Sequence, residues 1–185
     1  ITIPNSVTSI GSYAFYGCSS LTEITIPQNV TTLNDSVFSG CSKLTSITIP
    51  EGVTSIGSGA FEECSRLTSV TLPVSVTAIG DSAFYDCEKL TDVYYSGSKS
   101  DWEKVTIETY NDPLQKANIH FFVTSGKCGD DLTWTLYEDG ILFITGKGAM
   151  YDFPLSGGSG STPWYSYCEE IKTVRIGAGA TSIGE

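Results

Sequence analysis

Several residue types that support chemistry are scarce in this chain. Its 185 residues include one histidine, His120, and 10 Lys and Arg against 21 Asp and Glu, which gives a net charge of −11. This acidity disfavours nucleic acid and anionic membrane surfaces as partners. No stretch approaches the roughly 20 apolar residues of a membrane span. Sites built from several imidazoles are excluded, and neither a nucleophile elbow nor a Gly-rich phosphate loop occurs.

The acidic residues also fail to form a recognisable catalytic or metal site. Adjacent pairs occur at Glu62-Glu63, Asp130-Asp131 and Glu169-Glu170. Neighbouring side chains on an extended chain point apart, whereas paired catalytic carboxylates must converge across a gap. No D-x-D-x-D-G calcium loop is present. We therefore predict that the chain is not an enzyme and binds no cofactor and no metal.

A repeat of 23 residues dominates the first half of the sequence. Cys18, Cys41, Cys64 and Cys87 recur at this interval, and the surrounding residues recur with them in units 1–23, 24–46, 47–69 and 70–92. A unit this short cannot bury its apolar side alone, so it must stack on copies of itself. The repeat predicts a mainly β solenoid.

Two extended segments in each unit supply inward-facing residues. Leu21, Ile24 and Ile26 have the spacing of a short strand, and Val7 to Ile10 forms the second segment. Phe15 and its equivalents follow. Strands in a sheet lie roughly 4.8 Å apart, so each type of core residue should form a column along the solenoid.

Outward positions of the main strand are occupied by threonine in every unit. The two rows are Thr22, Thr45, Thr68 and Thr91, and Thr2, Thr25, Thr48 and Thr71. They can form a flat polar face that docks a glycan or a protein, but strand propensity alone is the favoured explanation. The units differ mainly in their turns, for example at Tyr16-Gly17, Ser39-Gly40, Glu62-Glu63 and Tyr85-Asp86. Any tuning of recognition within the repeats is therefore expected at these edges.

Glycine follows the second extended segment in three units, at Gly11, Gly57 and Gly80, and Asn34 takes the same place in the remaining unit. Asparagine tolerates a left-handed backbone best after glycine. We therefore expect a left-handed conformation at this position.

The repeat cysteines are expected to be buried free thiols that form a structural ladder. In a parallel stack their Cβ atoms would lie roughly 4.8 Å apart, whereas a disulfide needs about 3.8 Å. Cys168 is placed in the same ladder, because CEEIKTVRIGAGATSIG repeats the register. Cys128 lies outside the register, and either it pairs with Cys168 or both are free.

Residues 93–123 depart from the repeat and are expected to form a small α+β cap. Val93 to Tyr95 keeps the strand position, and Ser100 with Glu103 has capping-box spacing, which predicts a short helix around Trp102. A strand over 118–123 should close the piece. The cap would cover the end of the core, with Trp102 as its lid.

The remaining residues, 124–185, are expected to form a second module. Leu132, Trp134 and Leu136 alternate before a D-G turn, which predicts a β-hairpin. Thr162-Pro163-Trp164 has the pattern of a helix start with proline at its first position. A second run of repeats then begins at Cys168. Since the sequence starts at a strand and stops inside a repeat, we expect it to be a fragment, and the lack of a signal peptide is uninformative.

The repeats resemble the BspA-like, or treponema-type, leucine-rich repeats of bacterial surface proteins. The same eight residues, T, P, V, T, F, C, L and T, hold their positions in all four units, and 164–185 is a partial copy. The resemblance implies a non-enzymatic protein interaction module that is secreted or on the bacterial cell surface. One such module would be an adhesin that binds host extracellular matrix or other cells.

Two other function classes stay open. One is a structural spacer within a large wall-attached protein. The other is a carbohydrate-binding module, for which the candidate binding residues are four aromatics, Tyr94, Tyr95, Trp102 and Tyr110.

Overall fold

The computed structural model describes residues 3–153 and 162–183. The chain divides into two compact units, residues 1–120 and 121–185. Most regular structure in both units is β strand, in agreement with the predicted fold class.

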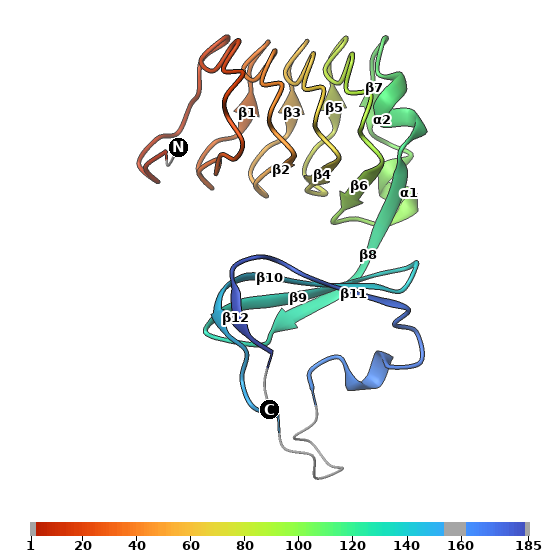
Figure 1. The fold of residues 1–185 in the computed structure, drawn as a ribbon. Helices are drawn as coiled ribbons and strands as arrows, with labels where there is room; N and C mark the ends of the chain where they lie inside the picture. Colours follow the sequence, from red (N-terminus) through yellow and green to blue (C-terminus); the bar gives the residue numbers. More distant parts are fainter. Residues whose placement is uncertain (1–2, 154–161, 184–185) are drawn as a thin grey trace. The chain divides into compact units, whose positions relative to one another are not determined.

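The first unit is a solenoid in which each repeat forms one coil, and the coils stack along one direction (Figure 1). Two parallel ladders run through the stack. The first contains β2 (Ser46–Thr48), β4 (Ser69–Leu72) and β6 (Asp92–Tyr95). The second contains β1 (Thr32–Leu33), β3 (Ser55–Ile56), β5 (Ala78–Ile79) and β7 (Thr106–Ile107). Strand partners such as Ile47 and Val70 lie one repeat apart, which confirms the predicted solenoid.

Core residues form the predicted columns. The phenyl rings of Phe15, Phe38, Phe61 and Phe84 stack with centroid distances of 5.4, 5.5 and 5.2 Å. All but Phe15, in the first coil, are fully buried. Stacked rings at this separation add attraction beyond the burial of apolar area.

The glycine row does not have the left-handed backbone that we expected. Positive φ occurs instead two residues later, at Tyr13, Ser36, Gly59, Ser82 and Tyr110, and again at Gly17, Gly40, Glu63 and Asp86. Gly57 and Gly80 lack room for a side chain, because the backbone of the preceding coil passes close to their Cα atoms. A Cβ on Gly57 would lie 2.7 Å from the amide nitrogen of Asp35, and one on Gly80 would lie 2.8 Å from that of Ser58. Asn34 uses its side chain here, since its Nδ2 donates to the carbonyl of Ile10 at 2.6 Å.

The cysteine column is present in the first unit. Cys41, Cys64 and Cys87 are fully buried, Cys18 is half-buried, and all four are free thiols. Cys168 is not part of this column, which corrects the sequence prediction. It lies in the second unit and is exposed, as is Tyr165 at the position of the column phenylalanines. Trp164 and Tyr167 pack against the core of this unit instead.

The cap has the predicted helix but a different capping box. Helix α1 (Lys99–Trp102) begins after Ser98, whose side chain accepts from the amide of Asp101 while the Asp101 carboxylate accepts from the amide of Ser98. Ser100 and Glu103 therefore do not cap the helix. This hydrogen bonding and Lys104 lower the pKa of Asp101 to about 2.

Asn111 connects the cap to the last coil. It precedes helix α2 (Asp112–Lys116) and is almost fully buried. Its Oδ1 accepts from the amide of Phe84 at 3.0 Å, and its Nδ2 donates to the carbonyls of Gly80 at 2.9 Å and Glu108 at 3.0 Å. Its Oδ1 thus takes the place of the carbonyl that a further coil would offer to the amide of Phe84, as the carbonyl of Ala83 does for the amide of Phe61.

The second unit is built on an antiparallel hairpin. Its strands are β8 (Asn118–Lys127, which begins in the first unit), β9 (Asp131–Tyr137), β10 (Ile141–Ala149), β11 (Thr173–Ile176) and β12 (Ala180–Ser182). The D-G turn joins β9 and β10, with Gly140 at a φ of 84°. Leu132, Trp134 and Leu136 point into the core, which confirms the predicted hairpin.

The remaining part of the second unit differs from the prediction in detail. A 3-10 helix, η1 (Tyr165–Tyr167), follows Trp164 as its N-cap, so Pro163 precedes the helix rather than occupying its first position. Cys128 is buried in the core and Cys168 is exposed, and both are free thiols.

Candidate interaction surfaces

The outer face of the β2, β4 and β6 ladder carries small polar side chains. Thr48 is exposed and Thr71 is half-buried on this face. In the adjoining row, the hydroxyl of Thr68 donates to the carbonyl of Thr45 at 3.0 Å, and that of Thr91 donates to the carbonyl of Thr68 at 3.3 Å. These hydroxyls tie successive coils together. This structural role was not part of the favoured explanation, which was strand propensity alone.

Two of the four aromatic candidates are core residues. Tyr94 pairs with Thr71 in the ladder but is 4% exposed, because the ring of His120 stacks on it at 4.6 Å. His120 Nε2 lies 2.8 Å from Asp92 Oδ1. Tyr95 is 1% exposed and pairs with Leu72, an inward position, so the register already indicated its burial. Neither ring can serve as a platform for a ligand.

Trp102 packs on the end of the core, as expected of a lid. Its ring meets that of Tyr95 edge to face at 5.1 Å and remains half-buried. Burial, followed by the nearby Asp101 carboxylate, raises the pKa of Tyr95. A cavity of about 120 Å³ lies beside this pair, lined in part by Val74, Val76 and Val105. It is smaller than the roughly 300 Å³ of ordinary ligand pockets.

Tyr110 is the one aromatic candidate that is largely exposed, at 64%. It lies on a surface that we call the turn edge, formed by residues 11–17, 34–40, 57–63, 80–86 and 107–111. The corresponding turns of successive coils lie side by side in Figure 1. Backbone hydrogen bonds join them, for example from the amide of Ser82 to the carbonyl of Thr109 at 2.9 Å.

The turn edge also exposes three tyrosines that were not chosen from the sequence. They are Tyr13, Tyr16 and Tyr85, which are 61%, 62% and 43% exposed. The first two rings meet edge to face at 5.9 Å. Tyr16 and Tyr85 occupy the variable turn before the cysteine, which was the available signal in the sequence.

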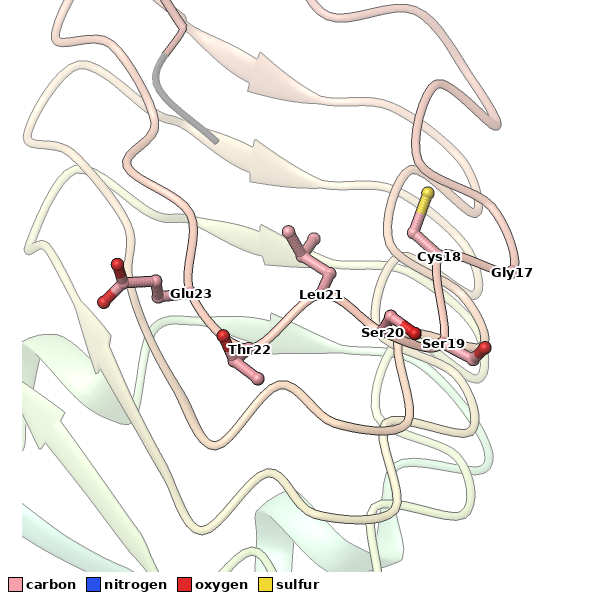
Figure 2. Close-up of a pocket in the computed structure, with 7 residues that line it drawn as sticks. All are labelled: Gly17, Cys18, Ser19, Ser20, Leu21, Thr22 and Glu23. Carbon is pink, nitrogen blue, oxygen red and sulfur yellow. The ribbon is translucent and has the colours of Figure 1, made fainter.

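A larger cavity, of about 590 Å³, lies on the first coil and is lined by residues 17–23. Figure 2 shows that the polar side chains of Thr22 and Glu23 spread along the coil and do not converge. All lining residues are consecutive in one coil, so this is an open flank and not an enclosed pocket. Among the described residues, no three potential metal-ligating side chains come together.

Comparison with known proteins relates the solenoid to one family. The model of the BspA type leucine rich repeat region matches residues 1–110 in six copies. No curated protein matches the sequence. In the part of the chain that the structure describes, no helix has the length and apolarity needed to cross a membrane.

Solved structures of bacterial proteins are similar to parts of the chain. A leucine rich cell surface protein from Faecalibacterium prausnitzii A2-165 is 35% identical, with a TM-score of 0.53, and the match covers 59% of this chain and 35% of that protein. The leucine rich repeat protein TpLRR of T. pallidum is 27% identical over 51% of this chain and 57% of its own, with a TM-score of 0.44. The pneumococcal vaccine antigen PcpA is 17% identical over 64% of this chain and 40% of its own, with a TM-score of 0.43. The chain therefore spans about a third of the F. prausnitzii protein and just over half of TpLRR.

Proposed function

Because the chain belongs to the BspA type leucine-rich repeat family, we propose that it is a non-enzymatic protein interaction module that acts as an adhesin. Its partner would be a host extracellular matrix protein or another cell surface. A bacterial surface or secreted location is proposed on the same basis, since the 35% identical F. prausnitzii protein is named a cell surface protein.

The observation that supports this function best is the extended surface of the solenoid. Stacked coils with continuous columns of buried side chains form a stiff body whose edges carry many exposed residues in fixed rows. Such repeats characteristically bind other proteins along these surfaces. Large exposed side chains gather on the turn edge, whereas Thr68 and Thr91 use their hydroxyls within the stack.

The test is direct binding of the intact 185-residue chain to immobilised matrix proteins, such as fibronectin and a collagen, and to intact bacterial cells. Saturable binding with a Kd in the micromolar range or tighter, absent from albumin-coated surfaces, is expected. Absence of binding to every protein and cell would contradict the proposal and favour the structural spacer.

The carbohydrate-binding alternative keeps only half of its candidate residues. Tyr94 and Tyr95 are buried, and only Trp102 and Tyr110 of the original set keep exposed ring surface. A glycan site would have to combine Tyr110 with the other exposed tyrosines of the turn edge.

A further inference from the structure

We infer that the turn edge binds an extended peptide segment rich in lysine and arginine. This inference rests on the proposed protein interaction function and names the chemistry of the partner. Three features of the turn edge support this inference. They are its charge, its exposed tyrosine rings and the distance between the coils that carry those rings.

The charge of the turn edge has one sign only. Its six carboxylates belong to Asp35, Glu62, Glu63, Asp81, Asp86 and Glu108, and its residue ranges contain no Lys or Arg. Among the described residues, none of these carboxylates forms an ion pair. The basic residues of the first unit all lie outside the edge, in the turns after the cysteines and in the cap. A cationic segment would therefore meet no like charge here.

Three of the six carboxylates are available to a partner. Asp35 Oδ1 accepts from the amide of Ser58 at 2.9 Å, Glu108 Oε2 accepts from the amide of Asp81 at 3.1 Å, and Asp81 itself accepts from hydroxyls. These three groups hold neighbouring coils together. The other three carboxylates accept no hydrogen bond within the described part of the chain. They belong to Glu62, Glu63 and Asp86.

The three available carboxylates lie on two adjacent coils. Glu63 and Asp86 occupy the same position of consecutive coils. Like charges placed opposite each other on neighbouring strands are destabilising, and a bound cation removes that repulsion. Each Lys or Arg that lies between them gains charge-assisted hydrogen bonds to oxygen atoms that have no other partner.

Tyrosine rings flank these carboxylates. Tyr16 and Tyr85 share one row, with Glu62 between them in the third coil. A tyrosine face attracts ammonium and guanidinium groups, and tyrosine and arginine are enriched where interfaces gain most of their energy. The edge thus offers one ring in the coil of Asp86, and a second, Tyr16, two coils before Glu62 with Ser39 between them.

The spacing of the row fits an extended peptide. Three coil steps, of 5.4, 5.5 and 5.2 Å in the phenylalanine column, separate the coils of Tyr16 and Tyr85, or roughly 16 Å. An extended chain advances about 3.3 Å per residue, so about five residues span the row. Alternate side chains of such a peptide would recur about every 6.6 Å, which is about 1 Å wider than one coil step.

The experiment uses the intact 185-residue chain and a fluorescein-labelled peptide of alternating lysine and glycine, measured by anisotropy at 150 mM salt. The triple variant E62Q/E63Q/D86N is expected to bind at least tenfold more weakly. The matched control E103Q/E138Q/E169Q also removes three negative charges, all of them exposed and outside the turn edge, and should change Kd by less than about twofold. Y16S/Y85S is expected to weaken binding about three- to tenfold, whereas Tyr165→Ser, which removes an exposed tyrosine of the second unit, should not.

Equal losses in the two triple variants would overturn the inference, because the peptide would then respond only to net charge. Weakening by Y16S/Y85S alone, together with binding of a neutral oligosaccharide, would also overturn it and assign the edge to a glycan. If the chain binds matrix proteins but the turn-edge variants bind them unchanged, this inference fails while the adhesin proposal stands. Circular dichroism melts of each variant exclude unfolding as the cause.

Discussion

The thiol of Cys64 donates a hydrogen bond to the carbonyl oxygen of Phe38, in the preceding coil, at 3.3 Å. Cys41 and Cys87 make the same bond to Phe15 and Phe61, at 3.3 and 3.1 Å. Each of these cysteines fills a core position and adds a second hydrogen bond to a carbonyl that already accepts from a backbone amide, as Phe38 does from Cys41 at 3.1 Å. A cysteine at this position thus links its coil to the preceding one without forming a disulfide.

Thiol reactivity should follow the burial of each cysteine. In the native chain at pH 8, Cys168 should be alkylated first and Cys18 more slowly, whereas the buried Cys41, Cys64 and Cys87 should resist. Peptide mass spectrometry after a short iodoacetamide pulse measures this order. After denaturation without reductant, all six cysteines should react. A repeat cysteine that stays blocked in the denatured chain would contradict the free-thiol ladder.

Stability should fall as the pH rises above 9. Burial, with a contribution from Cys18, raises the pKa of Cys41 from 9.0 to about 11, and burial raises that of Cys87 to about 12. The folded chain thus holds these protons more tightly than the unfolded chain. This stabilisation is fully present below pH 9 and is lost as the pH rises to between about 11 and 12, at no more than about 1.4 kcal/mol per pH unit for each thiol.

Urea denaturation between pH 8 and pH 11 measures this effect. The variant C41A/C87A should lose less stability over that range than the parent chain. The exposed Cys168→Ala is the control and should follow the parent. A parallel decline in all three proteins would assign the pH dependence to other groups.

The regular part of the fold could be predicted because one residue interval determines it. Once Phe38 is inward, Phe61 must be, and the structure stacks the two rings at 5.5 Å. The same logic places Tyr95 in the core, since it follows the register of Leu72. The exposure of Tyr94 could not be predicted in this way, because His120, which covers it, lies 26 residues later and outside any repeat.

Details that depend on distances between coils were not available from the sequence. Ser98 with Asp101 and Ser100 with Glu103 both fit a capping box, and only the folded geometry selects the first pair. The glycine row has the same limitation. A glycine that recurs at one position of a repeat indicates either a positive φ or the close approach of a neighbouring coil. At Gly57 the reason is the backbone of the preceding coil, which leaves no room for a Cβ.

Adding a methyl group to this row should therefore be costly only where a coil precedes it. A Cβ on Gly57 would lie 2.6 to 2.8 Å from atoms of Asn34 and Asp35, whereas one on Gly11 would have nothing within 4 Å. Gly57→Ala should lower the free energy of unfolding by about 1 to 3 kcal/mol, as overpacking does. Gly11→Ala should change it by less than about 0.5 kcal/mol. Chemical denaturation of both variants is the measurement, and equal effects would argue against close coil packing at Gly57.

Asn111 should matter more than its position in a variable turn indicates. Asn111→Ala would leave the buried amide of Phe84 without its acceptor, whereas the carbonyl of Gly80 would keep the amide of Ala83 at 3.3 Å. A buried polar group that loses its partner costs about 1 to 3 kcal/mol, so the free energy of unfolding should fall by at least that amount. The amide of Phe84 should also exchange its hydrogen faster, because local opening of the last coil becomes easier.

The control is Asn29→Ala, which removes an exposed bond from Nδ2 to the carbonyl of Asn5 at 2.9 Å. It should cost less than about 0.5 kcal/mol, since water replaces the lost donor at an exposed site. Denaturant melts compare the two variants, and hydrogen exchange follows the Phe84 amide in each. An unchanged exchange rate of the Phe84 amide in Asn111→Ala would show that the Asn111 side chain does not protect the last coil from local opening. Faster amide exchange confined to the last coil would show that the cap stabilises the end of the solenoid through Asn111.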